Sequence, residues 1–195
     1  WCGIDLGASQ SKLVFLDLDF KVLYSEKVPT PLYTDEEALF SFLSAFYADS
    51  RNAAGIPDSK IKAIGLAVSG LVDSENNLLV SGGNWGLPRG SALKISKLAD
   101  LTGHSVCSCT TAVAAVLAEY HLGRQAGVGN LVSIGIGVGV GSGVVANHSL
   151  LISHPDRPVK YIKNILIPGN EHRCVCGWQG CLESYSGGKK KKKII

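Results

Sequence analysis

Two glycine-punctuated segments, at residues 3–9 and 135–143, constrain the fold of this chain more than any other feature. The first reads Gly-Ile-Asp-Leu-Gly-Ala-Ser, and the second reads Gly-Ile-Gly-Val-Gly-Val-Gly-Ser-Gly. An apolar strand pattern follows each of them, at residues 13–18 and 144–146. Two strand–turn–strand units can face each other across a cleft, where free backbone N–H groups can hold phosphate oxygens. The pair therefore favours a nucleotide cleft, with ordinary hairpin turns, which also require glycine, as the alternative.

One acidic side chain lies within the first segment. Asp5 stands two residues before Gly7, so it lies next to the first turn. Carboxylate oxygens are ligands that Mg²⁺ and its bound waters prefer. Asp5 could therefore position Mg²⁺ beside bound phosphates.

The composition is that of a folded globular chain. Of its 195 residues, 46% are hydrophobic, which suffices for the core of one large domain or two small ones. The net charge of +3 depends on the five lysines Lys189–Lys193; without them, 14 of the 19 basic residues remain against 16 acidic ones. A slightly acidic body argues against a general nucleic-acid surface. We expect the lysine run to be a solvated tail.

The ends of the chain and its apolar runs bear on where the protein works. The chain contains no Met and begins at Trp1 within a strand pattern, so we expect the natural start to lie upstream. No secretory signal pattern is visible. The longest apolar run, residues 131–146, is too short and too rich in glycine for a membrane helix. The cysteine spacing suits a metal better than disulfides, so we expect a cytoplasmic protein with no membrane partner.

Hydrophobic periodicity and turn residues predict the secondary structure. Beyond the two glycine segments, strands are expected at residues 22–28, 61–68 and 105–109, with a hairpin over 71–73 and 78–80. Helices are expected at residues 35–49, 92–101 and 112–122, the first opened by a capping box of Thr34 and Glu37. This order of elements predicts an α/β fold with a mixed sheet.

The same order predicts two domains. Residues 1–129 should form an N-terminal α/β domain, and residues 130–188 should form part of a second, related domain with the glycine hairpin and a cysteine loop. This second domain lacks most of the helices that would bury its hairpin, so we expect the chain to be incomplete. Residues 189–195 are expected to lie outside the fold.

Three cysteines, Cys174, Cys176 and Cys181, lie close together in the sequence. Three thiolates at this spacing can hold one Zn²⁺ tetrahedrally if a fourth ligand joins them. His172 and His154 are candidates for that ligand. The alternative is three reduced cysteines without a metal.

Glu183 directly follows the cysteine loop, at the end of the run Gly-Cys-Leu-Glu. A carboxylate beside a rigid loop could hydrogen-bond the hydroxyl groups of a substrate. A glutamate in the first turn of a helix is also favoured by the helix dipole alone. The residues themselves leave both interpretations open.

Four segments together resemble the ROK family, which groups bacterial sugar kinases with sugar-responsive repressors. In chain order they are residues 3–9, residues 65–73 (Gly-Leu-Ala-Val-Ser-Gly-Leu-Val-Asp), the glycine run 135–143, and the loop from Cys174 to Glu183. The loop ending in Gly-Cys-Leu-Glu is the most specific of them. The resemblance covers nearly the whole chain up to Gly188.

The resemblance implies an actin/hexokinase-like (ribonuclease H-like) fold and ATP-dependent phosphorylation of a hexose or N-acetylhexosamine. ATP and Mg²⁺ would be cofactors, zinc would be structural, and the protein would form a homodimer. The residues implied in cofactor binding are Asp5, Gly7, Ala8, Ser9, Gly137, Val138, Gly139 and Gly141. The residues implied in sugar binding are Gly70, Asn84 and Glu183.

Several positions depart from the family's pattern. Thr111 stands where family kinases carry the Asp that accepts the proton of the sugar hydroxyl. A threonine hydroxyl cannot accept a proton near pH 7, so general-base catalysis worth about 10²–10⁴-fold would be lost. Tyr161 replaces a sugar-binding Glu, Asn164 replaces the His that completes the zinc site, and Val138 replaces a Thr of the second turn.

These departures leave three functions open. The first is a ROK-type sugar kinase with degenerate catalysis. The second is a non-catalytic, sugar-sensing transcriptional regulator of the same family. The third and weakest is a purely structural pseudokinase that works through dimer contacts. DNA binding by such a regulator would require a helix-turn-helix upstream of Trp1.

Overall fold

The computed structural model describes most of the chain. The described residues are 1–73, 76–80, 85–88, 90–123, 126–151, 162–174 and 176–188. Asn84, His154, Tyr161 and the lysine run 189–193 lie outside these ranges. Contacts between residues divide the chain into two compact units, Trp1–Thr111 and Ala112–Ile195.

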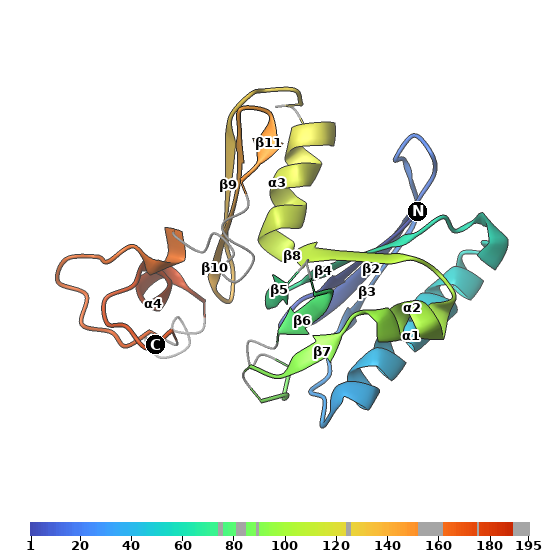
Figure 1. Cartoon of the computed structure of the whole chain (residues 1–195), viewed down its shortest axis with the longest axis horizontal. Coiled ribbons are helices and arrows are strands. Elements are labelled where there is room, and N and C mark those ends of the chain that lie inside the picture. Colours follow the sequence, from blue (N-terminus) through green and yellow to red (C-terminus); the bar gives the residue numbers. More distant parts are fainter. Residues whose placement is uncertain are drawn as a thin grey trace. The chain divides into compact units, whose positions relative to one another are not determined.

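The first unit is built on a five-stranded sheet with the strand order β3-β2-β1-β4-β8 (Figure 1). Its strands are β1 (Cys2–Leu6), β2 (Gln10–Leu16), β3 (Val22–Pro29), β4 (Ile64–Val68) and β8 (Val106–Thr110). β1 pairs with β2 and β2 with β3 in antiparallel fashion, whereas β1, β4 and β8 run parallel. The mixed sheet predicted from the sequence is therefore confirmed.

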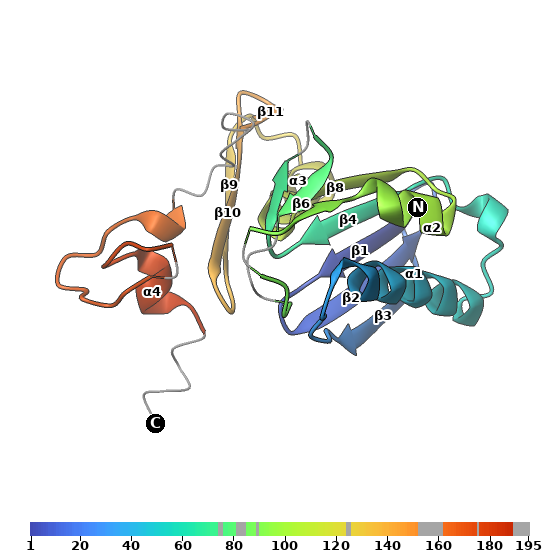
Figure 2. The ribbon, with the colours of Figure 1, turned by 60° about the horizontal axis from the view of Figure 1, so that its bottom comes forward.

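Two helices, α1 (Glu36–Ala53) and α2 (Ser96–Thr102), share a hydrophobic core with this sheet (Figure 2). Alternate residues of β1 point into that core, as expected for a strand with one covered face. The buried residues of β1 are Cys2, Ile4 and Leu6, and those of α1 include Leu39, Phe40, Leu43, Phe46 and Tyr47. Asp5 of β1 lies on the opposite face of the sheet and is only partly buried.

Helix α1 is capped by a different residue from the one that the sequence predicts. The Asp35 carboxylate, not the Thr34 hydroxyl, accepts a hydrogen bond from the Ala38 N–H at 2.8 Å. Thr34 Oγ1 instead donates to Asp35 at 3.1 Å. Both residue types can cap a helix, and the carboxylate also interacts favourably with the positive end of the helix dipole. The prediction of Thr34 as the cap is therefore wrong.

A smaller antiparallel sheet contains β5 (Leu71–Asp73), β6 (Leu78–Val80) and β7 (Ala92–Lys94). The hairpin predicted over β5 and β6 is confirmed. The helix predicted from residue 92 begins only at Ser96, because Leu93 pairs with Leu79 in this sheet and both side chains are buried. Sheet pairing has overridden local helix propensity there.

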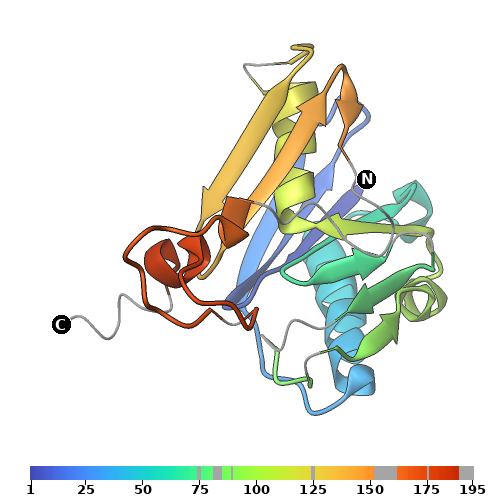
Figure 3. The same ribbon diagram turned by 60° about the vertical axis from the view of Figure 1, so that its left-hand side comes forward.

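The second unit contains a three-stranded antiparallel sheet of order β11-β10-β9, and Figure 3 shows helix α3 lying along β9 and β10. Its elements are α3 (Thr111–Leu122), β9 (Leu131–Ile136), β10 (Val140–Ala146), β11 (Ser149–Leu150), the 3-10 helix η2 (Ile162–Asn164) and α4 (Leu182–Ser186). The first residue of α3 is the last residue of the first unit. The helix and hairpin predicted for this region are confirmed.

Helix α3 lies directly against β10. A Cβ atom on Gly143 would lie 2.5 Å from Val116 Cγ1 and 2.6 Å from the Ala112 carbonyl oxygen, so only glycine fits. A Cβ atom on Gly141 would lie 3.1 Å from Ala112 Cβ. The contacts therefore group α3 with the hairpin, while the domain boundary at residues 129 and 130 stays a prediction.

The described helices are of modest length. The longest is α1, with 18 residues and two acidic residues in its first turn. Across the described ranges, no helix has both the length and the apolar character that a membrane span requires.

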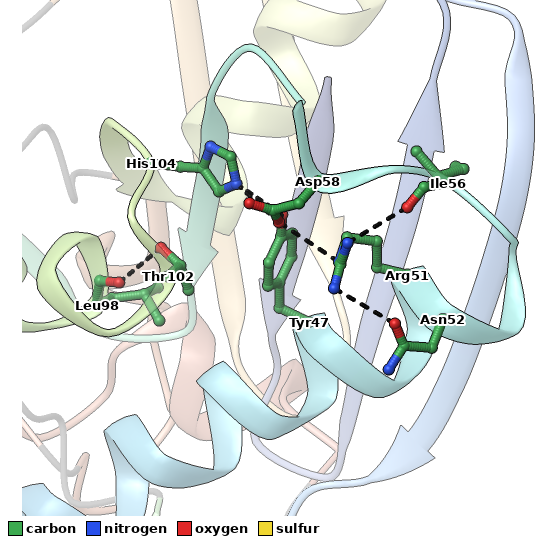
Figure 4. Close-up of polar contacts among 8 residues, drawn as sticks. All are labelled: Tyr47, Arg51, Asn52, Ile56, Asp58, Leu98, Thr102 and His104. Carbon is green, nitrogen blue, oxygen red and sulfur yellow. Dashed lines mark hydrogen bonds and ion pairs between the residues drawn. The ribbon is translucent and has the colours of Figure 1, made fainter. Parts of the chain in front are cut away.

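A polar cluster joins α1 to the short 3-10 helix η1 (Asp58–Lys60), as Figure 4 shows. Asp58 Oδ1 accepts a hydrogen bond from the Tyr47 hydroxyl at 2.8 Å. The same oxygen lies 3.2 Å from His104 Nε2 and 3.4 Å from Arg51 Nε. Hydrogen bonds from His104 and Tyr47 hold the pKa of Asp58 below its usual value, and burial raises the pKa of Tyr47.

Because folding lowers the pKa of Asp58, its charged form should stabilise the protein above about pH 4, and this contribution should be lost as the pH falls through the folded pKa. We expect the difference in urea midpoint between wild type and Asp58→Asn to shrink between about pH 5 and about pH 3, as measured by circular dichroism. Asp19→Asn, at an exposed carboxylate, serves as the control. A difference that stays constant over this range would contradict the prediction.

Candidate active site

The carboxyl ends of β1, β4 and β8 meet at one edge of the five-stranded sheet. Their parallel registers pair Leu6 with Val68 and Val68 with Thr110. Asp5 lies one residue before the end of β1, and Thr111 directly follows β8. Ligand sites in α/β sheets form outside the carboxyl ends of parallel strands, so this edge is the candidate site of the first unit.

Asp5 and Thr111 are in direct contact at this edge. Thr111 Oγ1 donates a hydrogen bond to Asp5 Oδ1 at 3.2 Å, and Lys12 Nζ lies 3.6 Å from Asp5 Oδ2. The Asp5 side chain is 26% exposed, so a cation or water can still reach it. Thr111 is a donor in this contact, and its hydroxyl cannot act as a base near neutral pH. The sequence predicts a role for each residue but not the contact between them.

The first glycine turn connects β1 to β2 beside this edge. A Cβ atom on Gly7 would lie 2.4 Å from the Gln10 carbonyl oxygen, so the turn accepts only glycine there. Ala8 and Ser9 complete the turn, and the Ser9 carbonyl accepts a hydrogen bond from the Thr30 N–H at 3.0 Å. The structure thus brings the turn next to Asp5, as the sequence predicts, while its role in binding phosphate stays a prediction.

Gly70 has a packing role that the sequence does not reveal. A Cβ atom there would lie 3.0 Å from the Trp85 ring and 3.1 Å from the Val80 carbonyl oxygen. Trp85 is fully buried, so its ring cannot easily move away. Gly70 therefore allows this close packing, and its role in binding sugar stays a prediction. The adjacent Asn84 lies outside the described residues.

The second glycine turn connects β9 to β10 within the other unit. The Gly137 N–H donates to the Gly139 carbonyl at 2.9 Å, and Val138 at the tip is 40% exposed. Glu183 contacts this turn, because its Oε2 accepts a hydrogen bond from the Val140 N–H at 3.0 Å. Gly141 lies beyond the turn, against α3. The structure brings Glu183 and residues 137–139 together, but places Gly141 apart from the tip.

The three predicted metal ligands form a cluster in the second unit. The Sγ atoms of Cys174, Cys176 and Cys181 all lie within 4.8 Å of one another, and those of Cys176 and Cys181 are 3.5 Å apart. Backbone hydrogen bonds close the loop that carries them, from Cys174 N–H to the Trp178 carbonyl at 2.7 Å and from Gly177 N–H to the Cys174 carbonyl at 3.0 Å. The tight loop therefore gathers the three thiols without a disulfide.

The pKa values of Cys176 and Cys181 are shifted in opposite directions. Burial raises the pKa of Cys181. Burial acts in the same direction on Cys176, but hydrogen bonds from the Trp178 backbone and from the two neighbouring thiols outweigh it and lower the pKa of Cys176. Cys176 therefore becomes a thiolate, the form that binds metals, more readily than Cys181 does.

The cluster fits a zinc ion in donor type and spacing. Zn–S bonds of 2.3 Å in a tetrahedron place sulfur atoms about 3.8 Å apart, close to the spacing found here. His172 is exposed and does not belong to the cluster, so its role as fourth ligand stays a prediction. Outside the loop, the Asn164 side chain contacts the cluster, because its Nδ2 donates to Cys176 Sγ at 3.3 Å.

Sequence reasoning missed one polar residue near Glu183. Lys163 Nζ lies 3.6 Å from Glu183 Oε1, and the two side chains are only 23% and 16% exposed. The two residues are 20 positions apart, and no periodic pattern connects them. The two side chains come together only when the loop between them folds, so the sequence alone does not indicate the pair.

The arrangement of strands and helices is the actin/hexokinase-like α/β fold. A ROK family glucokinase from Streptomyces griseus, solved in complex with glucose and AMPPNP, aligns with a TM-score of 0.80 and 26% identity. The alignment covers 96% of this chain and 57% of that one.

The family model for the ROK family matches residues 1–192, and the chain belongs to this family. A glucokinase from Streptomyces coelicolor is 28% identical over 96% of this chain and 56% of its own length. The DNA-binding transcriptional dual regulator NagC from Escherichia coli K12 is 26% identical over 93% of this chain and 44% of its own length. The chain thus spans about half the length of these curated relatives, which include both a kinase and a transcriptional regulator.

We expect the purified protein to contain about one equivalent of zinc, measured by elemental analysis without added metal, because three clustered thiolates suit this ion. Cys181→Ser should lose most of the metal, whereas Cys107→Ser, at an exposed cysteine outside the cluster, should retain it. A content below about 0.2 equivalents in the wild type would contradict the zinc prediction.

Asn164→His should tighten zinc binding, because an imidazole beside Cys176 can complete a tetrahedral Cys₃His site. Competition with a chromophoric chelator should show an affinity at least about tenfold higher than that of wild type. Asn164→Ala, which removes the amide without adding a ligand, is the matched control. Equal affinities for the histidine and alanine variants would show that residue 164 does not face the metal.

Proposed function

We propose that the chain is the sugar-binding and phosphate-binding part of a ROK-type sugar kinase, which phosphorylates a hexose or N-acetylhexosamine with ATP. The observation that carries the proposal is the meeting of Asp5, the first glycine turn and Thr111 at the carboxyl ends of parallel strands. Membership of the ROK family and the glucokinase relatives support it.

Asp5 and the glycine turns would serve ATP in this proposal. Asp5 is partly exposed and would hold Mg²⁺ or its bound waters, and the ion would neutralise phosphate charge. Backbone N–H groups of residues 7–9 and 137–139 would hold phosphate oxygens. Catalysis would then consist mainly of positioning and electrostatic stabilisation.

The sugar-binding residues are Gly70, Asn84 and Glu183 in this proposal, and the cysteine cluster would hold a structural zinc. A site built to hydrogen-bond sugar hydroxyls can discriminate strongly between sugars, because a missing partner leaves buried polar groups unpaired. The thiols of Cys2, Cys107, Cys174, Cys176 and Cys181 form no disulfide, which supports a reducing compartment, the cytoplasm. We also expect a homodimer.

Thr111 sets the expected rate of the kinase. Its hydroxyl donates to Asp5 and offers no base to the sugar hydroxyl. Loss of a general base slows proton transfer by about 10²–10⁴-fold. The proposed enzyme therefore binds its substrates and turns them over slowly.

A second candidate function is a sugar-sensing transcriptional regulator that binds sugar without chemistry. The observation that favours it is Thr111 at the base position, together with the relative NagC. Such a protein needs a DNA-binding element, so a helix-turn-helix encoded upstream of Trp1 would distinguish it from the kinase.

Thr111→Asp should raise turnover in the full-length natural protein by about 10²–10⁴-fold, because it supplies the missing base. Coupled ADP-release assays with glucose, N-acetylglucosamine, N-acetylmannosamine and allose measure this. Thr111→Val, which removes the hydroxyl without adding a carboxylate, controls for loss of the contact with Asp5. Sugar binding with no turnover in either the wild type or Thr111→Asp would rule out the kinase and favour the regulator.

A further inference from the structure

The second glycine turn is held at one end by Glu183 of α4 and at the other end by Gly188, which lies just beyond α4. At one end, the Gly188 N–H donates to the Gly137 carbonyl at 2.7 Å. At the other end, the Val140 N–H donates to Glu183 Oε2 at 3.0 Å. The turn is therefore fixed by two contacts from outside its own hairpin.

The tip of the turn, by contrast, keeps its hydrogen-bond donors available. Within the part of the chain that the structure describes, the N–H groups of Val138 and Gly139 donate to no other group. Two neighbouring backbone donors in a tight turn are a suitable site for a phosphate oxygen. Fixing the ends of the turn therefore determines where these two donors lie.

The bond between Glu183 and Val140 is sterically and electrostatically favoured. A Cβ atom on Gly139 would lie 2.7 Å from Glu183 Oε2, so the glycine leaves room for the carboxylate. Lys163 Nζ lies 3.6 Å from the other carboxylate oxygen, and the Glu183 side chain is 16% exposed. A charged acceptor in such a partly buried place makes a stronger hydrogen bond than a neutral one.

The position of Glu183 depends in turn on the cysteine loop. Ser184 Oγ donates to the Cys181 carbonyl at 2.7 Å, and the Leu182 N–H donates to the Ile165 carbonyl at 2.8 Å. These contacts fix the start of α4 next to the cysteine cluster. The carboxylate of Glu183 therefore projects from an anchored segment toward the turn.

We infer that Glu183 is a positioning residue for the phosphate-binding turn. Its carboxylate holds the Val140 N–H and so presents the N–H groups of Val138 and Gly139 to a phosphate oxygen, while Lys163 orients the carboxylate. This role is additional to the proposed contact with a sugar hydroxyl, and it differs from a helix-dipole effect. It rests on the proposed function, since it names the turn as the place where ATP phosphate binds.

Two measurements on the same variants test the inference. The first is the exchange rate of the Val140 amide hydrogen without ligand, followed by NMR, which reports the hydrogen bond itself. The second is the affinity for a non-hydrolysable ATP analogue. In Glu183→Ala, the Val140 amide should exchange about tenfold faster, and the affinity for the analogue should fall by about tenfold. Both changes follow because a hydrogen bond to a charged group is lost.

The conservative variant separates positioning from general stability. Glu183→Gln keeps an oxygen that can accept from Val140, so its exchange and affinity should stay within about threefold of wild type. Glu171→Ala is the matched control, because this glutamate belongs to the same unit and is exposed.

The outcomes distinguish this inference from the proposed function. Unchanged Val140 exchange in Glu183→Ala overturns the inference. Faster exchange with unchanged analogue affinity also overturns it, because the turn would then not bind phosphate. If the wild type fails to bind the analogue, the proposed function fails, and the exchange rates still decide whether Glu183 holds the turn. Should Glu183→Ala not fold, a Glu183→Gln variant with tenfold faster exchange would overturn the inference.

Discussion

Parallel pairing of β1, β4 and β8 is the constraint on which the first unit depends. Parallel strands require long crossover connections, so their carboxyl ends gather residues that are far apart in the sequence. The hydrogen bond between Thr111 and Asp5 joins residues 106 positions apart as a direct result. Asp5 and the glycine turn that follows it thereby share one edge with the Thr111 hydroxyl, which comes from a distant part of the sequence.

In the second unit, hydrogen bonds within a short loop hold the elements in place. Its cysteine loop is closed by backbone hydrogen bonds and holds α4 at Cys181. Helix α4 has only 5 residues, too few to be stable alone, so its place comes from these contacts. A metal bound by the three thiols would stabilise the same loop, because such binding energy contributes directly to folding.

Local patterns in the sequence predict most elements of this fold, and tertiary contacts explain the exceptions. Alternation and turn residues suffice for the sheet strands and the hairpins, because each signal lies within a few residues. The start of α2 is displaced by the pairing of Leu93 with Leu79, which no local pattern encodes. Site residues can likewise be named from motifs, but the pair of Lys163 and Glu183 depends on how a loop folds back.

The glycines of the run 135–143 serve two unrelated structural purposes. A Cβ atom on Gly135 or Gly137 would meet nothing within 4 Å, whereas a Cβ atom on Gly143 would clash with both the backbone and a side chain of α3. Gly137 and Gly139 thus belong to the turn, whereas Gly141 and Gly143 set the distance between a helix and a strand. A search for this glycine motif treats both groups as one signature. A protein whose turn no longer binds phosphate would nevertheless have to keep Gly143, because the packing of α3 on β10 requires it.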